Sequence, residues 1–276
     1  MASLELRVSL QGRQWRADAA RAYDLSIPLA FDAPQPSFFG AAAASGRPLV
    51  AGTFVGDVRE GGSCNCATYA FTPHCNGTHT ECVGHLTHDR IGIRDLALPT
   101  YVIARLVTLA PTPAANTAEQ SDPAPRPGDE LITRASLAAA LGPESLLEAA
   151  ALVVRTTPNP PAKRHRSYGP ERPPPYFSAE FMRSIVADGV QHLIVDLPSI
   201  DRAEDAGRLT AHRLFFGLPP GSADATQAQR AQATVTELAY VDDAIPDGWY
   251  VLNLQVAPFV ADAAPSRPLL LPLVAL

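Results

Sequence analysis

The 276-residue sequence lacks the features that mark several common protein classes. No stretch approaches the roughly 18 consecutive apolar residues that a membrane-spanning helix needs. Glu5 and Arg7 interrupt the apolar core that a signal peptide would require. The 22 basic residues are outnumbered by 28 acidic ones, a net charge of −6, so the basic footprint of a nucleic-acid-binding protein is missing. We therefore expect a cytoplasmic protein that binds neither membranes nor nucleic acids.

Three widespread sequence motifs of enzymes are also missing. The chain contains no Gly-x-Ser-x-Gly motif, which disfavours a serine hydrolase of the nucleophile-elbow type. It contains neither a P-loop nor a Gly-x-Gly-x-x-Gly fingerprint, which disfavours nucleotide cofactors.

Cysteine is scarce and clustered, since the four cysteines all lie between positions 64 and 82. A secreted scaffold would spread its cysteines along the chain to join distant loops. The cluster indicates either a metal-binding neighbourhood or small apolar packing residues. The spacing contains no Cys-x-x-Cys pair, which disfavours a structural zinc site.

Proline, by contrast, is abundant, with 27 residues, and predicts many irregular connections. Two segments, 111–128 and 158–175, have the composition of proline-rich loops within a single domain over residues 1–276. The second loop carries Lys163, Arg164, Arg166 and Arg172. It is interpreted either as a solvated loop or as a wall over a site that attracts anions.

Short alternating or β-branched segments outnumber helical ones and predict a β-rich α/β fold with a mixed sheet. We expect helices over residues 136–141 and 178–188. The expected strands cover 4–10, 23–28, 50–54, 64–71, 101–109, 152–155, 192–196, 234–240 and 249–256.

The strongest chemical signal is a histidine cluster, because four of the seven histidines lie between positions 74 and 88. Imidazole and carboxylate groups together bind Zn²⁺, Mn²⁺ or Fe²⁺. In an extended segment, His79, Glu81 and His85 are separated by even numbers of residues and would project from one face. This segment is therefore the candidate metal site.

These residues resemble a known family. The segment Gly77-Thr-His-Thr-Glu81, with His85 four residues later, is similar to the Gly-Thr-His-x-Asp-x-x-x-His core of the cyclase family, which includes kynurenine formamidase and isatin hydrolase. Asp24–Pro28 and Val195–Asp201 resemble two further segments of that family. The resemblance implies a swivelling β/β/α fold, usually assembled as a homodimer or homotetramer.

The resemblance also implies a ligand set and an activity. One or two divalent ions, Zn or Mn, would be held by a set in which His212 and Glu237 join the central motif: His74, His79, Glu81, His85, His212 and Glu237. The implied activity is an arylformamidase-like hydrolysis of a small amide, formamide or lactam. The alternatives are a metal-dependent lactonase, dehydratase or cyclase, or a degenerate member that only binds a ligand.

Two positions depart from the family pattern. Position 81 is Glu instead of Asp, and Cys75 occupies the slot of the family's first histidine. We expect a local bulge to bring His74 to that slot, with the Cys75 thiolate as the alternative ligand.

Proton transfer to an amine leaving group needs an acid, and we assign this role to three candidates: Glu81, Glu237 and His88. The 234–240 strand would place Glu237 on an apolar face, where an unpaired carboxylate is costly without a metal or cation. We interpret His192 as structural and His165 as exposed or facing the substrate. The substrate pocket is expected from the 158–175 loop and the region around Phe38 and Phe39.

Overall fold

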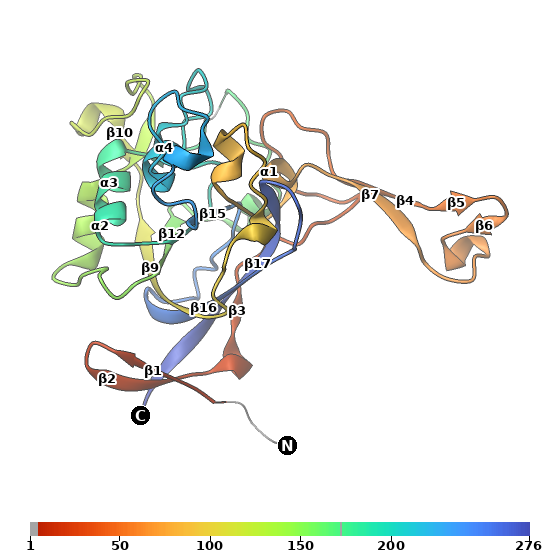
Figure 1. Cartoon of the computed structure of the whole chain (residues 1–276), viewed down its shortest axis with the longest axis horizontal. Helices are drawn as coiled ribbons and strands as arrows, with labels where there is room; N and C mark the ends of the chain where they lie inside the picture. Colours follow the sequence, from red (N-terminus) through yellow and green to blue (C-terminus); the bar gives the residue numbers. More distant parts are fainter. Residues whose placement is uncertain (1–4, 172) are drawn as a thin grey trace.

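A ring of seven strands forms the centre of the molecule in the computed structural model, which describes residues 5–171 and 173–276 (Figure 1). Neighbouring strands in the ring are hydrogen-bonded in the order β17-β16-β9-β12-β14-β15-β8, and β8 pairs with β17 to close it. The bounds are β8 His79–Glu81, β9 Val102–Leu109, β12 Ala151–Thr156, β14 His192–Val195, β15 Thr234–Glu237, β16 Gly248–Val256 and β17 Ala263–Ala275. The fold is thus a strand-rich mixed α/β fold, as expected from the sequence.

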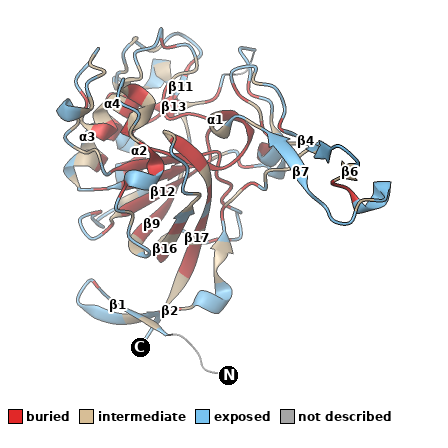
Figure 2. Cartoon of the chain, turned by 45° about the vertical axis from the view of Figure 1, so that its right-hand side comes forward, coloured by how far each residue is buried: buried red, intermediate tan, exposed pale blue. Residues whose placement is uncertain are grey.

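Strand β12, at the centre of the ring, is buried along its whole length, and its first four residues are all apolar because both faces of the strand are covered. Side chains alternate between faces along a strand. Leu152 and Val154 pack against the helices, whereas Ala151 and Val153 pack inside the barrel against residues such as Leu252. Figure 2 shows this buried interior beside an exposed periphery.

Three helices cover one side of the barrel: α2 Arg134–Leu141, α3 Ala179–Ala187 and α4 Thr210–Phe216 (Figure 1). Thr133 and Ser178 cap the first two, because each side-chain oxygen accepts a hydrogen bond from a backbone N–H in the first turn. Phe181 of α3 and Phe216 of α4 are fully buried against the sheet. This packing fixes α4, which carries His212.

Several short strands lie outside the ring. A hairpin of β1 Leu6–Leu10 and β2 Arg13–Ala17 extends the sheet beyond β17, and β3 Tyr23–Asp24 also pairs with β17. A three-stranded sheet is formed by β10 Thr112–Pro113, β11 Glu130–Ile132 and β13 Tyr176–Phe177. An arm of two small two-stranded sheets projects from the body (Figures 1 and 2): β4 Ser45–Pro48 pairs with β7 Ala67–Ala70, and β5 Val50–Ala51 pairs with β6 Phe54–Val55.

Several elements differ from the sequence-based expectations. The strand expected over 50–54 is interrupted by Gly52, whose φ of 60° turns the chain between β5 and β6. The strand expected over 64–71 starts only at Ala67. The strand expected over 234–240 ends at Glu237, because Leu238 has a φ of 52°.

The longest strand of the ring, β17, was not expected from the sequence. Its three prolines disfavour a strand assignment, because proline has no N–H to donate. The structure accommodates all three by using their carbonyls, because Pro265, Pro268 and Pro272 accept backbone hydrogen bonds from Ala257, Leu25 and Asp18, respectively.

The basic residues of the 158–175 loop are not simply solvated, and those described contact protein groups. Lys163 is buried, and its Nζ donates to Asp196 Oδ2 at 2.8 Å. Arg164 and Arg166 stack over the rings of Tyr240 and Tyr168. Arg172 lies outside the described residues.

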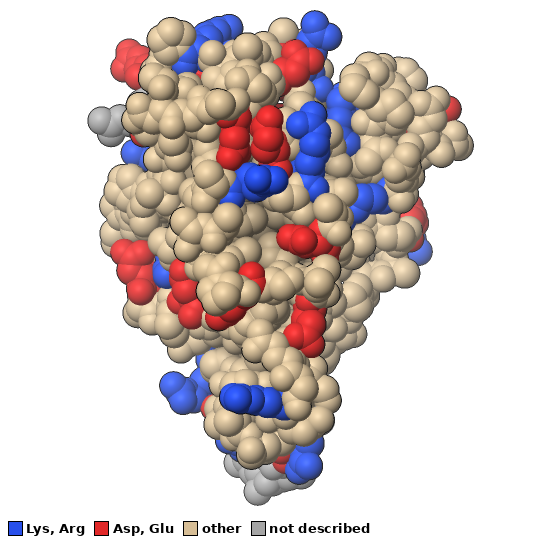
Figure 3. All heavy atoms as spheres, turned by 90° about the vertical axis from the view of Figure 1, so that its left-hand side faces the viewer, with Lys and Arg blue, Asp and Glu red and all other residues tan. Residues whose placement is uncertain are grey.

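The surface carries charges of both signs. On the face shown in Figure 3, acidic and basic side chains are interleaved, and neither sign dominates. Among the described residues, no helix is long and apolar enough to cross a membrane.

Candidate metal centre

Strand β8 carries the central motif and lies between two partner strands. Its His79 pairs with Glu237 of β15, and its Glu81 pairs with Ala263 of β17, both in antiparallel register. Directly opposed residues share a face, and so do residues two apart in a strand. The strand ladders thus direct His79, Glu81 and Glu237 to one side, where all three are buried.

A second imidazole completes the buried group. His212 of α4 places its Nε2 at 2.6 Å from Glu81 Oε1 and at 3.5 Å from Glu237 Oε1. His79 Nε2 lies 3.4 Å from Glu237 Oε2. The backbone N–H of Ile200 donates to Glu237 Oε1 at 2.8 Å and fixes that carboxylate. We call these residues, His79, Glu81, His212 and Glu237, the inner half of the site.

The outer half consists of His74, His85 and Asp262, whose side chains are 24%, 28% and 37% exposed. Asp262 Oδ2 lies 2.9 Å from His74 Nε2 and 3.2 Å from His85 Nδ1. The other nitrogen of His74, Nδ1, lies 2.9 Å from Glu81 Oε2. Glu81 therefore joins the two halves, with one oxygen facing His212 and the other facing His74.

Asp262 was missed by the sequence analysis. It lies in a bend just before β17, and its backbone carbonyl accepts a hydrogen bond from the Cys82 N–H at 3.0 Å. That bond continues the β8–β17 ladder and sets Asp262 beside the end of the central motif. Only knowledge of the strand pairing could have identified it, because no local motif surrounds it.

Two of the histidines have one ring nitrogen that contacts a group outside the metal centre. His212 Nδ1 lies 2.6 Å from Asp201 Oδ2, and His79 Nδ1 lies 3.1 Å from the Gly77 carbonyl. A proton on each of these nitrogens leaves the other nitrogen with its lone pair directed at Glu81 or Glu237. This is the arrangement that histidine ligands adopt around a metal ion.

The protonation equilibria reflect this crowding of imidazole and carboxylate groups. Burial opposes the shift, but hydrogen bonds to Asp262 and Glu81 raise the pKa of His74 to about 10. Burial also works against ionisation of Glu81, yet His85 and His212 hold its pKa well below the usual value. Hydrogen bonds from His74 and His85 lower the pKa of Asp262. The carboxylates of the site thus favour a positive charge among them, and a divalent ion would supply such a charge.

Buried atoms without a hydrogen-bond partner indicate that a cation fits. Among the described residues, His79 Nε2, His212 Nε2 and both carboxylate oxygens of Glu81 are buried without an aligned hydrogen bond. Leaving buried polar atoms unpaired is costly. A divalent ion between imidazole nitrogens and carboxylate oxygens would satisfy them all at once. Three overlapping groups bring ligand atoms within 4.8 Å of one another: His74, His79 and Glu81; Glu81, His212 and Glu237; His74, His85 and Asp262.

The segment before β8 forms a helical turn, not the expected bulge. This turn, α1 Pro73–Asn76, directs His74 to Glu81 and turns Cys75 away. Cys75 is buried in an apolar cluster with Ile27 and Phe38. The histidine therefore occupies the site and the neighbouring cysteine serves as a packing residue.

The extended segment assumed for the motif is shorter than expected. β8 ends at Glu81, and residues Val83–Leu86 form a 3₁₀ turn that carries His85 toward Asp262. His85 thus reaches the site through this turn, and the expectation that it projects from the same strand face as His79 was wrong.

His88 lies apart from these groups. Its side chain is exposed, and it belongs to none of the three groups of potential ligands among the described residues. His192 is buried and its Nδ1 lies 2.9 Å from Thr234 Oγ1, as befits a structural residue. His165 is exposed.

The cysteines do not form a site of their own. Cys64 and Cys66 are exposed on the arm, whereas Cys75 and Cys82 are buried in two different apolar clusters. All four are free thiols.

Solved structures with the same fold include isatin hydrolase A from Labrenzia aggregata bound to benzyl benzoate (TM-score 0.60, 16% identity, 93% of this chain and 94% of that chain). Isatin hydrolase A from Ralstonia solanacearum has a TM-score of 0.57 at 16% identity and covers 92% of both chains. A structure from Bacillus stearothermophilus described as a predicted metal-dependent hydrolase has a TM-score of 0.57 at 15% identity, over 91% of this chain and 97% of that chain.

At the level of sequence, no curated protein matches the chain. The Cyclase family model matches residues 23–202, more than half of the chain, which include the central histidine motif. The chain therefore belongs to the cyclase family.

Proposed function

We propose that the protein is a metal-dependent hydrolase that cleaves the C–N bond of a small amide, formamide or lactam. The observation that carries this proposal is the inner half of the site, where two imidazoles and two carboxylates are buried with ligand atoms pointing at one another. The description of structural neighbours as metal-dependent and isatin hydrolases supports the same class of reaction.

The residues present fit a divalent ion of the Zn or Mn type, because the donor set combines imidazole nitrogens with carboxylate oxygens. Such an ion, when bound, would lower the pKa of a water molecule and polarise the substrate carbonyl. The three overlapping ligand groups support a capacity for one or two ions. That the protein works as a homodimer or homotetramer stays a prediction from the family resemblance.

Neighbouring residues fix the protonation and the orientation of the potential metal ligands. Asp201 and the Gly77 carbonyl keep a proton on Nδ1 of His212 and His79, so that each Nε2 remains a donor atom for the ion. The Ile200 N–H fixes Glu237 Oε1, and Glu237 Oε2 faces His79. We assign proton transfer to the amine leaving group to Glu237, with Glu81 holding the two halves of the site together.

The test compares two histidines of the same segment. We expect purified protein to contain one or two equivalents of Zn or Mn by mass spectrometry and to hydrolyse formanilide-type amides or isatin-type lactams. His79→Ala should lose the metal and the turnover, whereas His88→Ala should keep its metal.

The comparison has two informative failures. Activity indifferent to chelation, or a native chain that takes up neither Zn²⁺ nor Mn²⁺, would contradict the proposal. Turnover of lactones with no turnover of matched amides would support a metal-dependent hydrolase that cleaves esters instead of C–N bonds. Wild-type turnover in His88→Ala would leave Glu81 and Glu237 as the remaining candidates for proton transfer.

A further inference from the structure

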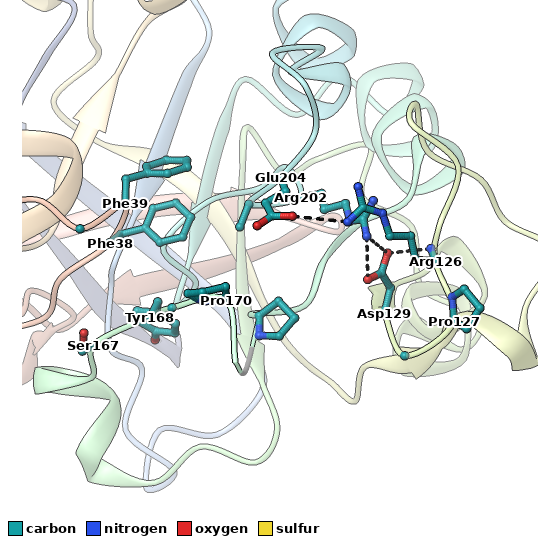
Figure 4. Close-up of a pocket in the computed structure, with 15 residues that line it drawn as sticks. Phe38, Phe39, Arg126, Pro127, Asp129, Ser167, Tyr168, Pro170, Arg202 and Glu204 are labelled. Atoms are coloured by element: carbon teal, nitrogen blue, oxygen red, sulfur yellow. Dashed lines mark hydrogen bonds and ion pairs between the residues drawn. The ribbon is translucent and has the colours of Figure 1, made fainter.

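Arginine side chains line several pockets of the protein, and two of these pockets differ in how the charges are balanced. The first, of about 560 Å³, contains Phe38, Phe39 and part of the 158–175 loop, the regions from which the sequence analysis expected the substrate pocket (Figure 4). Its two arginines are each paired with a carboxylate, as Figure 4 shows: Arg126 with Glu204 at 3.4 Å and Arg202 with Asp129 at 3.1 Å.

The second pocket, of about 320 Å³, is lined by residues of α3, of α4 and of the loops beside them. Its arginines are Arg183 of α3, Arg208 of the loop before α4, and Arg213 of α4. In the part of the chain that the structure describes, none of these three forms an ion pair with a carboxylate, whereas many other arginines do. Asp122 is the acidic residue among the lining residues. The pocket therefore has an excess of positive charge in a protein whose net charge is −6.

Helix α4 separates this arginine pocket from the metal centre. Residues three and four apart in a helix lie on one face, and Thr210, Arg213 and Leu214 share the face that lines the pocket. His212 does not share that face, and its buried Nε2 lies 2.6 Å from Glu81 Oε1. None of the potential metal ligands lines the arginine pocket, which is thus a separate site.

Arg213 is held in place without being neutralised. Its Nε donates a hydrogen bond to the Arg208 carbonyl at 2.9 Å. Its Nη1 donates to the carbonyls of Pro219 and Ser222 at 3.1 and 2.6 Å. All three acceptors are neutral backbone groups. These bonds therefore orient the guanidinium group and leave its positive charge available to an anion.

Arg208 lies in a turn whose shape is set by a buried carboxylate. Asp205 accepts hydrogen bonds from the backbone N–H groups of Gly207 and Leu209, at 2.8 and 2.5 Å. Gly207 has a φ of 73°, in the left-handed region that glycine adopts without strain. The Asp205 carboxylate thus stabilises the turn and forms no ion pair with Arg208 among the described contacts. The turn holds Arg208 next to Arg213, because the carbonyl of the first binds the side chain of the second.

The composition of the pocket indicates the chemistry of its ligand. Guanidinium groups bind carboxylates and phosphates through paired, charge-assisted hydrogen bonds. Three guanidinium groups around one pocket match the charge of a phosphate dianion, which offers more acceptor oxygens than a carboxylate does. Leu214, Leu218 and Pro220 add an apolar wall to the same pocket.

We propose that the arginine pocket binds a phosphate group, with Arg183, Arg208 and Arg213 donating to its oxygens. The group belongs either to a free phosphate ion or to a small phosphate monoester whose organic part contacts Leu214 and Leu218. This site is distinct from the hydrolase site, and the inference does not depend on the proposed function.

The test is calorimetry on the full chain after chelation of metal, at low ionic strength because salt screens exposed charges. The probes are inorganic phosphate, monobutyl phosphate and acetate. We expect the phosphates to bind at least about tenfold more tightly than acetate. Tighter binding of monobutyl phosphate than of inorganic phosphate would support the monoester, and equal affinity would support the free ion. No binding of either phosphate, or equal binding of acetate, would overturn the proposal.

Variants locate the phosphate. Arg183 and Arg208 are exposed, so Arg183→Gln and Arg208→Gln remove a charge without opening the core. Each should weaken phosphate binding roughly tenfold, and Arg183→Lys, which retains the charge, should weaken it less. Arg134→Gln changes an exposed arginine of α2 outside the pocket and is the matched control. Wild-type phosphate affinity in the Arg183→Gln/Arg208→Gln double variant would overturn the proposal.

The imidazole groups of the metal centre are the competing anion site. His79→Ala alters that centre and should leave phosphate affinity unchanged in the chelated protein. Loss of phosphate binding in His79→Ala would place the anion at the histidines and overturn the proposal. Because these measurements use chelated protein and no turnover, a failure of the proposed hydrolase function would leave their outcome unchanged.

Discussion

The two halves of the metal centre differ in how the fold positions them. The inner residues come from β8, β15 and α4, and their side chains are at most 5% exposed. The outer residues come from the α1 turn, a 3₁₀ turn and the bend before β17, and they are 24–37% exposed. The same chemical groups therefore occur once in a buried setting built from strands and a helix and once in a partly exposed setting built from turns.

This difference predicts that the two halves contribute differently to metal binding. Ladder hydrogen bonds and close packing hold the inner residues in one geometry. Metal binding by these residues therefore costs little conformational entropy. The outer residues lie in turns, which can adjust when a substrate or a second ion enters. We therefore expect the inner half to determine whether metal is held and the outer half to determine how many ions are held.

The largest effect should come from Glu81, because it is common to both halves. Its two oxygens face His212 and His74 at 2.6 and 2.9 Å. Glu81→Gln should abolish metal binding in both halves and turnover with it, as measured by metal content per chain. Glu81→Asp is the sharper test, since a carboxylate one methylene shorter cannot reach both imidazoles. If Glu81→Asp binds metal as the wild type does, the bridging role is refuted.

A smaller effect is expected from Asp201, which acts through His212. It accepts hydrogen bonds from the backbone N–H groups of Ala211 and His212 and contacts His212 Nδ1 at 2.6 Å. Asp201→Asn can retain the backbone contacts but can present an N–H to Nδ1, which favours the proton on Nε2. We expect metal affinity to fall about 10–100-fold, as for other partners of ligating histidines. A melting temperature of the chelated variant close to wild type would separate this from a folding defect.

Asp262 should affect only the outer half. Asp262→Asn removes the charge that faces both His74 and His85, so we expect the metal content to fall to the ion of the inner half. Titration with Zn²⁺ monitored by calorimetry would then show one binding step. Loss of all metal in this variant would contradict the division into two halves, and Asp89→Asn, an exposed neighbour of His88, is a suitable control.

The smallest effect concerns pH. In the chelated protein the pKa of His74 is raised from 6.5 to about 10, so its protonation stabilises the folded state fully below about pH 6.5. That stabilisation is lost as the pH rises toward 10. We expect the melting temperature of chelated wild type to fall more steeply between pH 6.5 and 10 than that of His74→Gln. Parallel curves for the two proteins would show that His74 has no such role.

Much of the inner half could be predicted from the sequence, because its residues lie in a recognisable motif or in segments that resemble the family. His79 and Glu81 are two residues apart on a strand, and the alternation of side chains alone puts them on one face. The apolar strand around Glu237 likewise indicated a buried carboxylate in need of a partner. The structure brings these residues together with His212.

The outer half was less accessible to prediction. His74 reaches the site because residues 73–76 form a helical turn, and a four-residue turn leaves no periodic pattern. Asp262 lies 177 positions from His85, and only the pairing of β8 with β17 brings them together. Because the prolines of β17 disfavour a strand assignment, neither that strand nor its pairing with β8 was predicted.

The closure of the barrel through β8 also has a consequence for biosynthesis. Residues 79–81 pair with residues 263–265, so this pairing of the ring cannot form before residues 263–265 have left the ribosome. Until then, the histidine motif lacks Asp262 and one of the two strands that flank it. A nascent chain that has not yet exposed residues 262–265 thus carries clustered imidazoles and thiols in which the outer half of the metal centre is incomplete.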